Sequence, residues 1–180
     1  MEKEFTLLVN TENNIGLLNH LSIVFTRRKL NIESLTVSES KIKDIYSFTI
    51  VIKTRRDIID RVAKQLENII GVIKVFVYEN EDIIHQELAM YKLPISAIDK
   101  GLKIEEVVRH HNARVLNIEN DYILIEKTGH KADTQKLMEE LKPFGILQFI
   151  RTGRIAMAKP MKDLEIHIRE KKEAYEIVED

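Results

Sequence analysis

The same order of predicted strands and helices occurs twice along this chain of 180 residues. Runs of alternating apolar residues predict strands, and apolar residues three or four positions apart predict helices. In the first half, strands are expected near residues 4–10, 32–39, 45–53 and 72–78, with helices near 15–28 and 57–69. In the second half, strands are expected near 86–94, 113–118, 121–127 and 145–158, with helices near 98–111 and 131–142. A βαββαβ order that occurs twice strongly restricts the possible folds.

Short signals mark where several of these elements begin and end. Asp57 is expected to cap the second helix, and Gly71 is expected to end it. Asn120-Asp121 predicts a tight hairpin turn between two strands of the second half. Gly153 is expected to bend or bulge the last strand, because glycine weakens regular pairing there.

The acidic run Glu79-Asn80-Glu81-Asp82 interrupts the pattern between the two halves. The sequence therefore predicts an α+β protein with two tandem ferredoxin-like domains, each a four-stranded antiparallel sheet with two helices on one face. Each sheet would keep an open edge, which favours pairing between chains and hence a dimer. The predicted divisions are a first domain at 1–79, a linker at 80–85, a second domain at 86–159 and a charged tail at 160–180.

Composition excludes several classes of function. Twenty-eight basic and twenty-nine acidic side chains leave a formal charge of -1, so no overall field attracts the chain to nucleic acid or anionic lipid. The absence of cysteine excludes disulfides, thiol catalysis and thiolate metal sites. No apolar run approaches the roughly 20 residues of a membrane span, and the N-terminus lacks a signal-peptide pattern. We therefore expect a soluble protein of the cytoplasm, with no membrane or nucleic-acid partner.

The turn Asn13-Asn14-Ile15-Gly16 connects the first predicted strand to the first predicted helix. Asn13 and Asn14 are good N-cap residues, and Gly16 can adopt a φ that alanine could not adopt cheaply. Unpaired N–H groups and the positive end of the helix dipole would favour a small anion such as a carboxylate. A well-capped helix start without any ligand is the alternative interpretation.

No catalytic or metal-binding pattern is recognisable in the chain. Phosphate-loop, dinucleotide-binding, zinc-protease, serine-hydrolase and calcium-loop motifs are all absent. His110 and His111 are adjacent, so on a helix they point about 100° apart and do not converge on one ion. Basic side chains at a helix C-terminus complement the helix dipole, which is the better interpretation of this pair.

The turn at Asn13 to Gly16, followed by Asn31-Ile32-Glu33-Ser34-Leu35-Thr36-Val37, resembles the regulatory ACT domain. More specifically, the chain resembles the small regulatory subunit of acetolactate synthase, also called acetohydroxyacid synthase. The resemblance continues through Arg61 to Leu66, Val72 to Val75, His85 to Lys92 and Arg151 to Met157. It covers nearly the whole chain up to about Lys159 and identifies the first domain as an ACT effector-binding domain.

This resemblance implies a subunit without catalytic residues of its own. It would bind the catalytic large subunit, raise its activity and confer feedback inhibition by a branched-chain amino acid, usually valine. Thiamine diphosphate, magnesium and FAD would be bound by the large subunit, and no cofactor or metal by this chain. Neighbouring ACT domains would form a homodimer with a continuous sheet.

The resemblance also implies an effector site. The residues that match the family's effector loop are Asn13, Ile15, Gly16 and Leu17, with Asn31 and Ile32 opposite them across the ACT dimer interface. Backbone N–H groups of the loop would hold the carboxylate of the amino acid, and the side chains of Asn13 and Asn31 would bind its polar groups. Apolar neighbours would enclose its side chain.

Four positions depart from the family pattern. Lys29 stands where the family usually has glycine near the end of the first helix, which makes the geometry of this helix end a point to test. Asn14 and Ile15 replace an acidic residue and proline, and Asn19 stands where serine is common. The shape of the pocket, and the effector that it accepts, can therefore differ from the family norm.

Two other classes of function stay open on the sequence. A free-standing ACT-domain sensor would share the first half, but a transcriptional regulator of this kind should carry a DNA-binding helix-turn-helix, and no such signal occurs. A small enzyme on a ferredoxin-like scaffold is the other alternative, because fold does not dictate function. The match at Arg151 to Met157 favours the small subunit over both.

Overall fold

The computed structural model describes residues 1–99 and 103–159. The predicted tail at 160–180 and the middle of the helix expected at 98–111 lie outside these residues. In chain order the elements are β1 (Lys3–Glu12), α1 (Leu17–Arg27), β2 (Ile32–Glu39), β3 (Ile45–Thr54), α2 (Arg56–Glu67), β4 (Val72–Tyr78), η1 (Asn80–Asp82), β5 (Ile83–Pro94), α3 (Ser96–Asp99), α4 (Lys103–His110), β6 (Arg114–Ile118), β7 (Tyr122–Gly129), α5 (Lys131–Leu141), η2 (Lys142–Phe144), β8 (Gln148–Arg151) and β9 (Ile155–Ala158).

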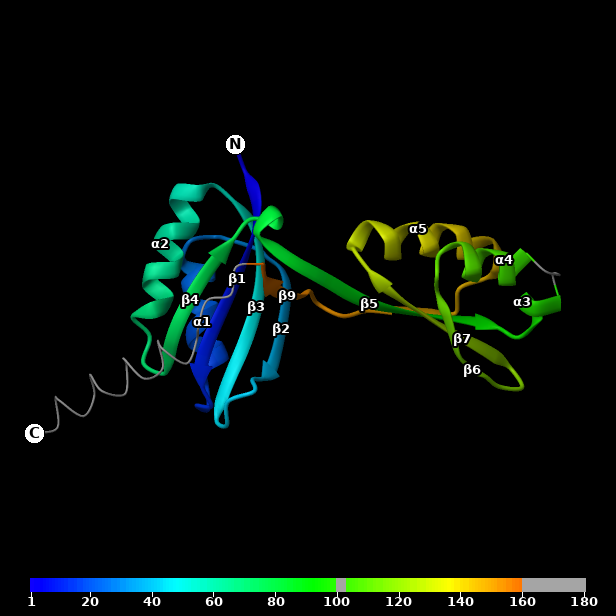
Figure 1. The fold of residues 1–180 in the computed structure, drawn as a ribbon, viewed down its shortest axis with the longest axis horizontal. Coiled ribbons are helices and arrows are strands. Elements are labelled where there is room, and N and C mark those ends of the chain that lie inside the picture. Colours follow the sequence, from blue (N-terminus) through cyan, green and yellow to red (C-terminus); the bar gives the residue numbers. More distant parts are fainter. Residues whose placement is uncertain (100–102, 160–180) are drawn as a thin grey trace, which may run out of the picture. The chain divides into compact units, whose positions relative to one another are not determined.

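The first domain is a four-stranded antiparallel sheet in the order β2-β3-β1-β4, with α1 and α2 packed on one face (Figure 1). Register aligns the apolar residues that face the helices: Leu7 pairs with Ile50, and Val9 pairs with Phe48. These side chains are buried with Leu21 and others from the two helices. Burial of each such side chain contributes about 1.5–3 kcal/mol, so this alternation determines which sheet face meets the helices.

The second domain repeats this order of strands. Its antiparallel sheet has the order β6-β7-β5-β8, and β9 also pairs with β5. Helices α4 and α5 lie on one face (Figure 1), where Tyr91, Leu93 and Ile125 form the core with Leu137 and Leu141. The predicted α+β class with two tandem ferredoxin-like domains is therefore confirmed.

Of two long elements predicted in the second half, the strand is divided in the structure and the helix is described only at its two ends. The helix expected at 98–111 is represented by α3, which ends at Asp99, and α4, which begins at Lys103. The strand expected at 145–158 is divided into β8 and β9, and Thr152 lies in the interruption that also contains Gly153. Backbone pairing continues at Thr152, whose N–H donates to the carbonyl of Leu88 at 2.9 Å and whose hydroxyl accepts from the N–H of Leu88 at 3.0 Å.

The helix caps predicted from side chains were wrong. Arg55, not Asp57, is the N-cap of α2, and no side chain caps this helix. Asp57 lies in the first turn instead, where two hydrogen bonds from Arg55 hold its carboxylate near the positive end of the helix dipole. Helix α2 ends at Glu67, four residues before Gly71, which takes a positive φ of 89° in the connection to β4.

Contacts divide the described chain into two compact units. One contains residues 1–84 and also residues 156–159, and the other contains residues 85–155. The segment 80–85, expected as a linker, contains η1 and the first residues of β5. None of the helices within residues 1–99 and 103–159 is long and apolar enough to cross a membrane.

Candidate effector site

The loop between β1 and α1 contains three of the six residues expected to bind an effector, and a fourth, Leu17, is the first residue of α1. Its backbone is held from both sides: the N–H of Asn13 donates to the carbonyl of Asp44 at 3.0 Å, and the N–H of Glu12 donates to the carbonyl of Gly71 at 2.8 Å. Within the loop, the N–H of Leu17 donates to the carbonyl of Asn14 at 3.3 Å. The loop is therefore fixed by the β2–β3 turn and by the connection from α2 to β4.

Gly16, rather than Asn13 or Asn14, is the N-cap residue of α1. It has φ 83° and ψ -3°, a left-handed conformation that glycine adopts without strain. Its carbonyl accepts the first hydrogen bonds of the helix, from the N–H groups of Asn19 and His20 at 3.0 and 3.2 Å. A Cβ atom built on Gly16 would meet nothing within 4 Å, so the space beside this residue is open.

Free backbone donors remain at the start of α1. Within the described residues, no acceptor takes the N–H of Ile15, Gly16 or Leu18. The positive end of the helix dipole lies at the same place. This arrangement can hold a carboxylate by chemistry that needs no charged side chain.

The side chains of this loop differ in what they contact. Leu17 is buried in the core and anchors the start of α1, whereas Ile15 is fully exposed. The amide of Asn14 donates to the carboxylate of Glu12 at 3.1 Å. Asn13 is exposed and makes no side-chain hydrogen bond within the described residues.

Asn31 and Ile32 lie at the opposite end of α1 from this loop. The helix has 11 residues, so it separates the two groups by about 16 Å. Asn31 is exposed, while Ile32 packs against the core and pairs with Ile52 of β3. One chain alone therefore does not bring the six predicted residues together.

The end of α1 takes the geometry of a glycine cap although glycine is absent. Lys29 has a positive φ of 54°. The N–H of Lys29 donates to the carbonyl of Thr26, and the N–H of Leu30 donates to that of Phe25, both at 3.0 Å. This is the Schellman pattern, in which a left-handed residue satisfies the last carbonyls of a helix. The departure from glycine at this position is thus accommodated by a strained lysine.

The edge formed by α1 and β2 carries exposed apolar side chains. β2 pairs only with β3, so its other edge pairs with no strand of the described chain. Val37 on β2 and Leu18 and Ile23 on α1 are all exposed. An open strand edge beside exposed apolar residues is a surface on which another chain can pair.

Gly71 contacts the loop of the candidate site, a role that was not predicted from the sequence. A Cβ atom at this position would lie 2.7 Å from Nδ2 of Asn14, closer than such atoms approach each other. Gly71 lies more than fifty positions after the loop that it contacts. The sequence indicated only that Gly71 ends a helix. That indication does not reveal which loop Gly71 supports.

The histidines and acidic residues do not form a metal centre in residues 1–99 and 103–159, where no group of three or more such side chains is close enough to bind an ion. His110 and His111 lie at the end of α4, as the sequence predicted. Nε2 of His111 lies 3.0 Å from Oε1 of Glu140, which links this helix end to α5. The contact between His111 and Glu140 therefore joins α4 to α5.

Comparisons with known proteins match both domains. A family model described as "AHAS small subunit-like ACT domain" matches residues 7–74, and one described as "Small subunit of acetolactate synthase" matches residues 86–160. The small subunit of acetolactate synthase from Bacillus subtilis is 33% identical over 160 residues, which cover 88% of this chain and 91% of the relative. That of Mycobacterium bovis is 31% identical over 157 residues, covering 87% and 93%.

A solved structure has the same fold. The crystal structure of the acetolactate synthase small subunit from Thermotoga maritima aligns with a TM-score of 0.80 and 23% sequence identity. The alignment covers 89% of this chain and 99% of that chain. Both domains and their order along the sequence are thus shared with a protein of known structure.

Proposed function

Because this chain belongs to the family of acetolactate synthase small subunits, we propose that it is the regulatory, non-catalytic subunit of that enzyme in branched-chain amino acid biosynthesis. It binds the catalytic large subunit in the cytoplasm, raises its activity and transmits feedback inhibition by valine or a related amino acid. The observation that carries the proposal is the match of both domains to small subunits over nearly their full length.

The family resemblance implies how the two subunits divide the work. Condensation of two pyruvates, or of pyruvate with 2-ketobutyrate, belongs to the large subunit, together with thiamine diphosphate, magnesium and FAD. This chain contributes a binding site instead of catalytic groups. The open donors at the start of α1 support that role, because they are suited to the carboxylate of an amino acid.

In our proposal the effector site is completed by a second copy of the chain. The loop with Asn13, Ile15, Gly16 and Leu17 binds the carboxylate, and Asn31 and Ile32 of the second copy complete the pocket. The separation of the two groups along α1 supports this, since one chain cannot supply both. The exposed edge of α1 and β2 is the surface through which the ACT domains would dimerise. Effector binding would then depend on dimer geometry, as an allosteric switch requires.

The first test measures acetolactate formation by the cognate large subunit with and without this chain. Valine, leucine and isoleucine are titrated in each case. Activation together with valine inhibition is expected. Activation without inhibition by any of the three would retain the partner but contradict the effector site, and no activation would favour a free-standing amino-acid sensor that controls a different partner.

A single substitution separates the effector site from partner binding. Gly16→Asp places a negative charge beside the effector carboxylate, so we expect loss of feedback inhibition with activation of the large subunit retained. Gly16→Asn is the matched control, because asparagine has nearly the same shape and also tolerates positive φ. Inhibition that survives in the Asn variant and disappears in the Asp variant would assign the effect to charge. Equal loss of activation and inhibition would contradict a separate effector site.

A further inference from the structure

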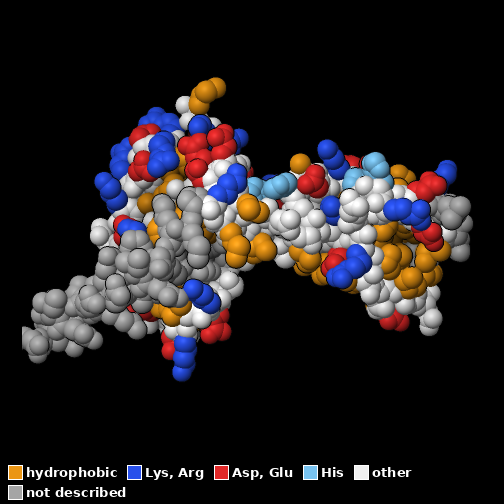
Figure 2. Space-filling model, viewed as in Figure 1, with side chains coloured by type: hydrophobic (Ala, Val, Ile, Leu, Met, Phe, Trp, Pro, Cys, Tyr) orange, Lys and Arg blue, Asp and Glu red, His pale blue; other side chains and the backbone are white. Residues whose placement is uncertain are grey.

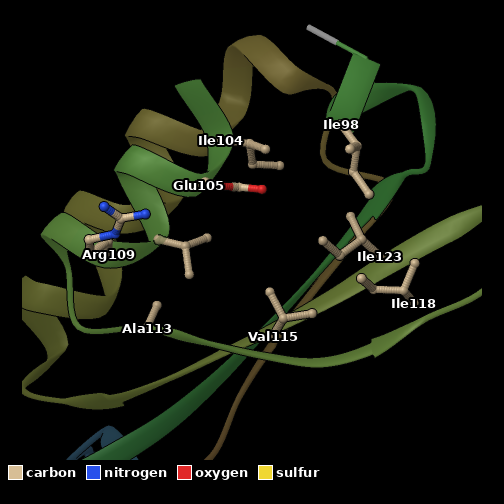
Figure 3. Close-up of a pocket in the computed structure, with 9 residues that line it drawn as sticks. Ile98, Ile104, Glu105, Arg109, Ala113, Val115, Ile118 and Ile123 are labelled. Atoms are coloured by element: carbon tan, nitrogen blue, oxygen red, sulfur yellow. The ribbon is translucent and has the colours of Figure 1, made fainter. Parts of the chain in front are cut away.

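The second domain contains an apolar cavity of about 370 Å³ between its helices and one edge of its sheet. Figure 3 shows side chains from α3 and α4 on one side facing side chains from β6 and β7 on the other. In Figure 2, hydrophobic side chains gather on this domain in the part where Figure 1 places α4, β6 and β7. The described lining contains no aromatic side chain, so it is complementary to an aliphatic group. Its isoleucines and valines are Ile98, Ile104, Val108, Val115, Ile118 and Ile123.

The size and accessibility of this cavity suit a small molecule. Pockets that bind small molecules have volumes of about 300–1,000 Å³, and this cavity lies near the lower end of that range. Val115 and Ile118 are 39% and 56% exposed, so solvent reaches the lining from the side of β6. A ligand that enters from this side can bury an aliphatic group against the lining, which is favourable because apolar surface leaves water.

Two opposite charges lie on the helix side of the cavity. Glu105 and Arg109 both line it from α4, where positions four apart are neighbours on the helix surface. Both residues are exposed, and neither has an ion-pair partner in the described part of the chain. A simple carboxylic acid could pair with Arg109 but would be repelled by Glu105, and a simple amine would meet the reverse situation. A ligand with an ammonium group and a carboxylate on the same carbon satisfies both side chains.

We propose that this cavity binds a free α-amino acid with an aliphatic side chain. The carboxylate of the ligand pairs with the guanidinium of Arg109, and its ammonium group pairs with the carboxylate of Glu105. The aliphatic side chain of the ligand lies among the isoleucines and valines of the lining. The site lies entirely in the second domain, apart from the loop between β1 and α1, so it does not rest on the effector site proposed for the first domain.

Methyl NMR of the isoleucines in the full-length chain tests this site directly, with leucine as the probe. The Gly16→Asp variant is the background, because its added charge is expected to disable the effector site of the first domain. We expect the methyl signals of Ile104, Ile118 and Ile123 to shift and saturate as leucine is added. Ile150 is the control, since it is 55% exposed in the same domain but does not line the cavity. Its signal should stay in place.

Truncated ligands and matched variants test the two charge contacts. Leucinamide lacks the carboxylate of leucine, and 4-methylpentanoate lacks its ammonium group. Exposed ion pairs contribute little, so each truncation should weaken binding about two- to fivefold. Arg109→Met should bind leucine and leucinamide equally, and Glu105→Gln should bind leucine and 4-methylpentanoate equally, because each variant lacks the partner of the missing group. A merely structural role of either residue would instead weaken all three ligands alike.

Absence of saturable shifts at the isoleucines of the lining would overturn the proposal, and so would equal shifts at Ile150. Shifts that follow the protein concentration but not leucine would assign the cavity to another copy of the chain and would overturn it as well. Unchanged discrimination among the three ligands in both variants would overturn the recognition by Glu105 and Arg109. Failure of valine to inhibit the unchanged protein would contradict the effector site of the first domain and would leave this test unaffected.

Discussion

The two domains share one strand order but differ in how completely each closes its own core. Among the described residues, the buried hydrophobic cluster of the first domain has fifteen members and that of the second has nine. The edge strands differ in the same direction: β2 has eight residues, several of them partly buried, whereas all five residues of β6 are exposed. A common topology therefore does not require equal burial.

Among the described residues, the two buried charged side chains, Glu87 and Arg154, belong to the second domain. The carboxylate of Glu87 is 7% exposed and lies 3.4 Å from Nε of Arg151. Burial raises the pKa of Tyr91 to about 12, and its neutral hydroxyl donates to the carbonyl of Thr134 at 2.6 Å. Buried polar groups of this kind favour a single arrangement of a small core when every group has its hydrogen-bond or charge partner. A buried polar group that loses its partner destabilises the core instead. The second domain thus keeps a buried charge pair beside a small apolar core, whereas the first domain has the larger apolar core.

The largest expected effect comes from truncating a matched leucine in each core. Leu21 and Leu141 are both fully buried, and Leu→Ala in such positions costs about 2–5 kcal/mol of unfolding free energy. We expect Leu21→Ala to cost more than Leu141→Ala, because the larger first core surrounds the cavity more completely and collapses less. Hydrogen exchange on peptides from each domain measures the two losses separately. A greater loss in the second domain would contradict the comparison.

The next largest loss of stability is expected when one ion pair is removed from each domain. Arg151→Met should cost about 3 kcal/mol, because it leaves the buried Glu87 without its charge partner. Arg56→Met removes an exposed pair with Asp60 and should cost less than about 1 kcal/mol. Denaturant unfolding followed by domain-resolved hydrogen exchange checks both values. Similar losses of unfolding free energy in the two variants would show that the buried ion pair stabilises its domain no more than the exposed one.

Helix ends offer a smaller test. Two positions after the last residue of α1 and of α4 stands a residue with positive φ, Lys29 at 54° and Asn112 at 48°. Lys29→Gly should stabilise the first domain by about 0.5–1 kcal/mol because it relieves left-handed strain. Asn112→Gly should change the second domain very little, since asparagine adopts this conformation readily. Thermal unfolding of the two variants, with Lys29→Asn as an intermediate control, measures the difference.

The smallest effect concerns pH. Hydrogen bonds from Arg55 to the carboxylate hold the pKa of Asp57 at about 2, whereas its value in the unfolded chain is about 3.9. The lowered pKa stabilises the folded first domain above about pH 4, and this contribution disappears as the pH falls from 4 toward 2. The melting temperature of the Asp57→Asn variant should therefore be lower than that of the unchanged protein at pH 5. At pH 2 the two melting temperatures should be equal. A difference that persists at pH 2 would exclude this linkage.

Strand positions could be predicted closely where an alternating pattern decides burial. β2 and β4 begin and end at the residues expected, 32–39 and 72–78. Helix caps were less predictable, because they depend on competing contacts. Asp57 bonds to Arg55 and Arg61 rather than capping α2, and the left-handed Gly16 caps α1 without any side chain.

The candidate effector site could be predicted only in its local part. Asn13 to Leu17 are neighbours in the sequence, so a loop motif identifies them together. Their contact with Gly71 depends on how the connection from α2 to β4 folds back onto β1. The relation of this loop to Asn31 involves a second chain in our proposal, which no pattern in one sequence can place.

The number of domains, the order of their elements and the resemblance to a family can be predicted from the amino-acid sequence alone. These properties follow from side-chain periodicity, which is local and has a period of two in strands and 3.6 in helices. The support of the Asn14 loop by Gly71 and the open apolar edge of β6 become visible only in the folded chain. Each of these depends on contacts between segments far apart in the chain, and a local pattern does not specify which segments meet.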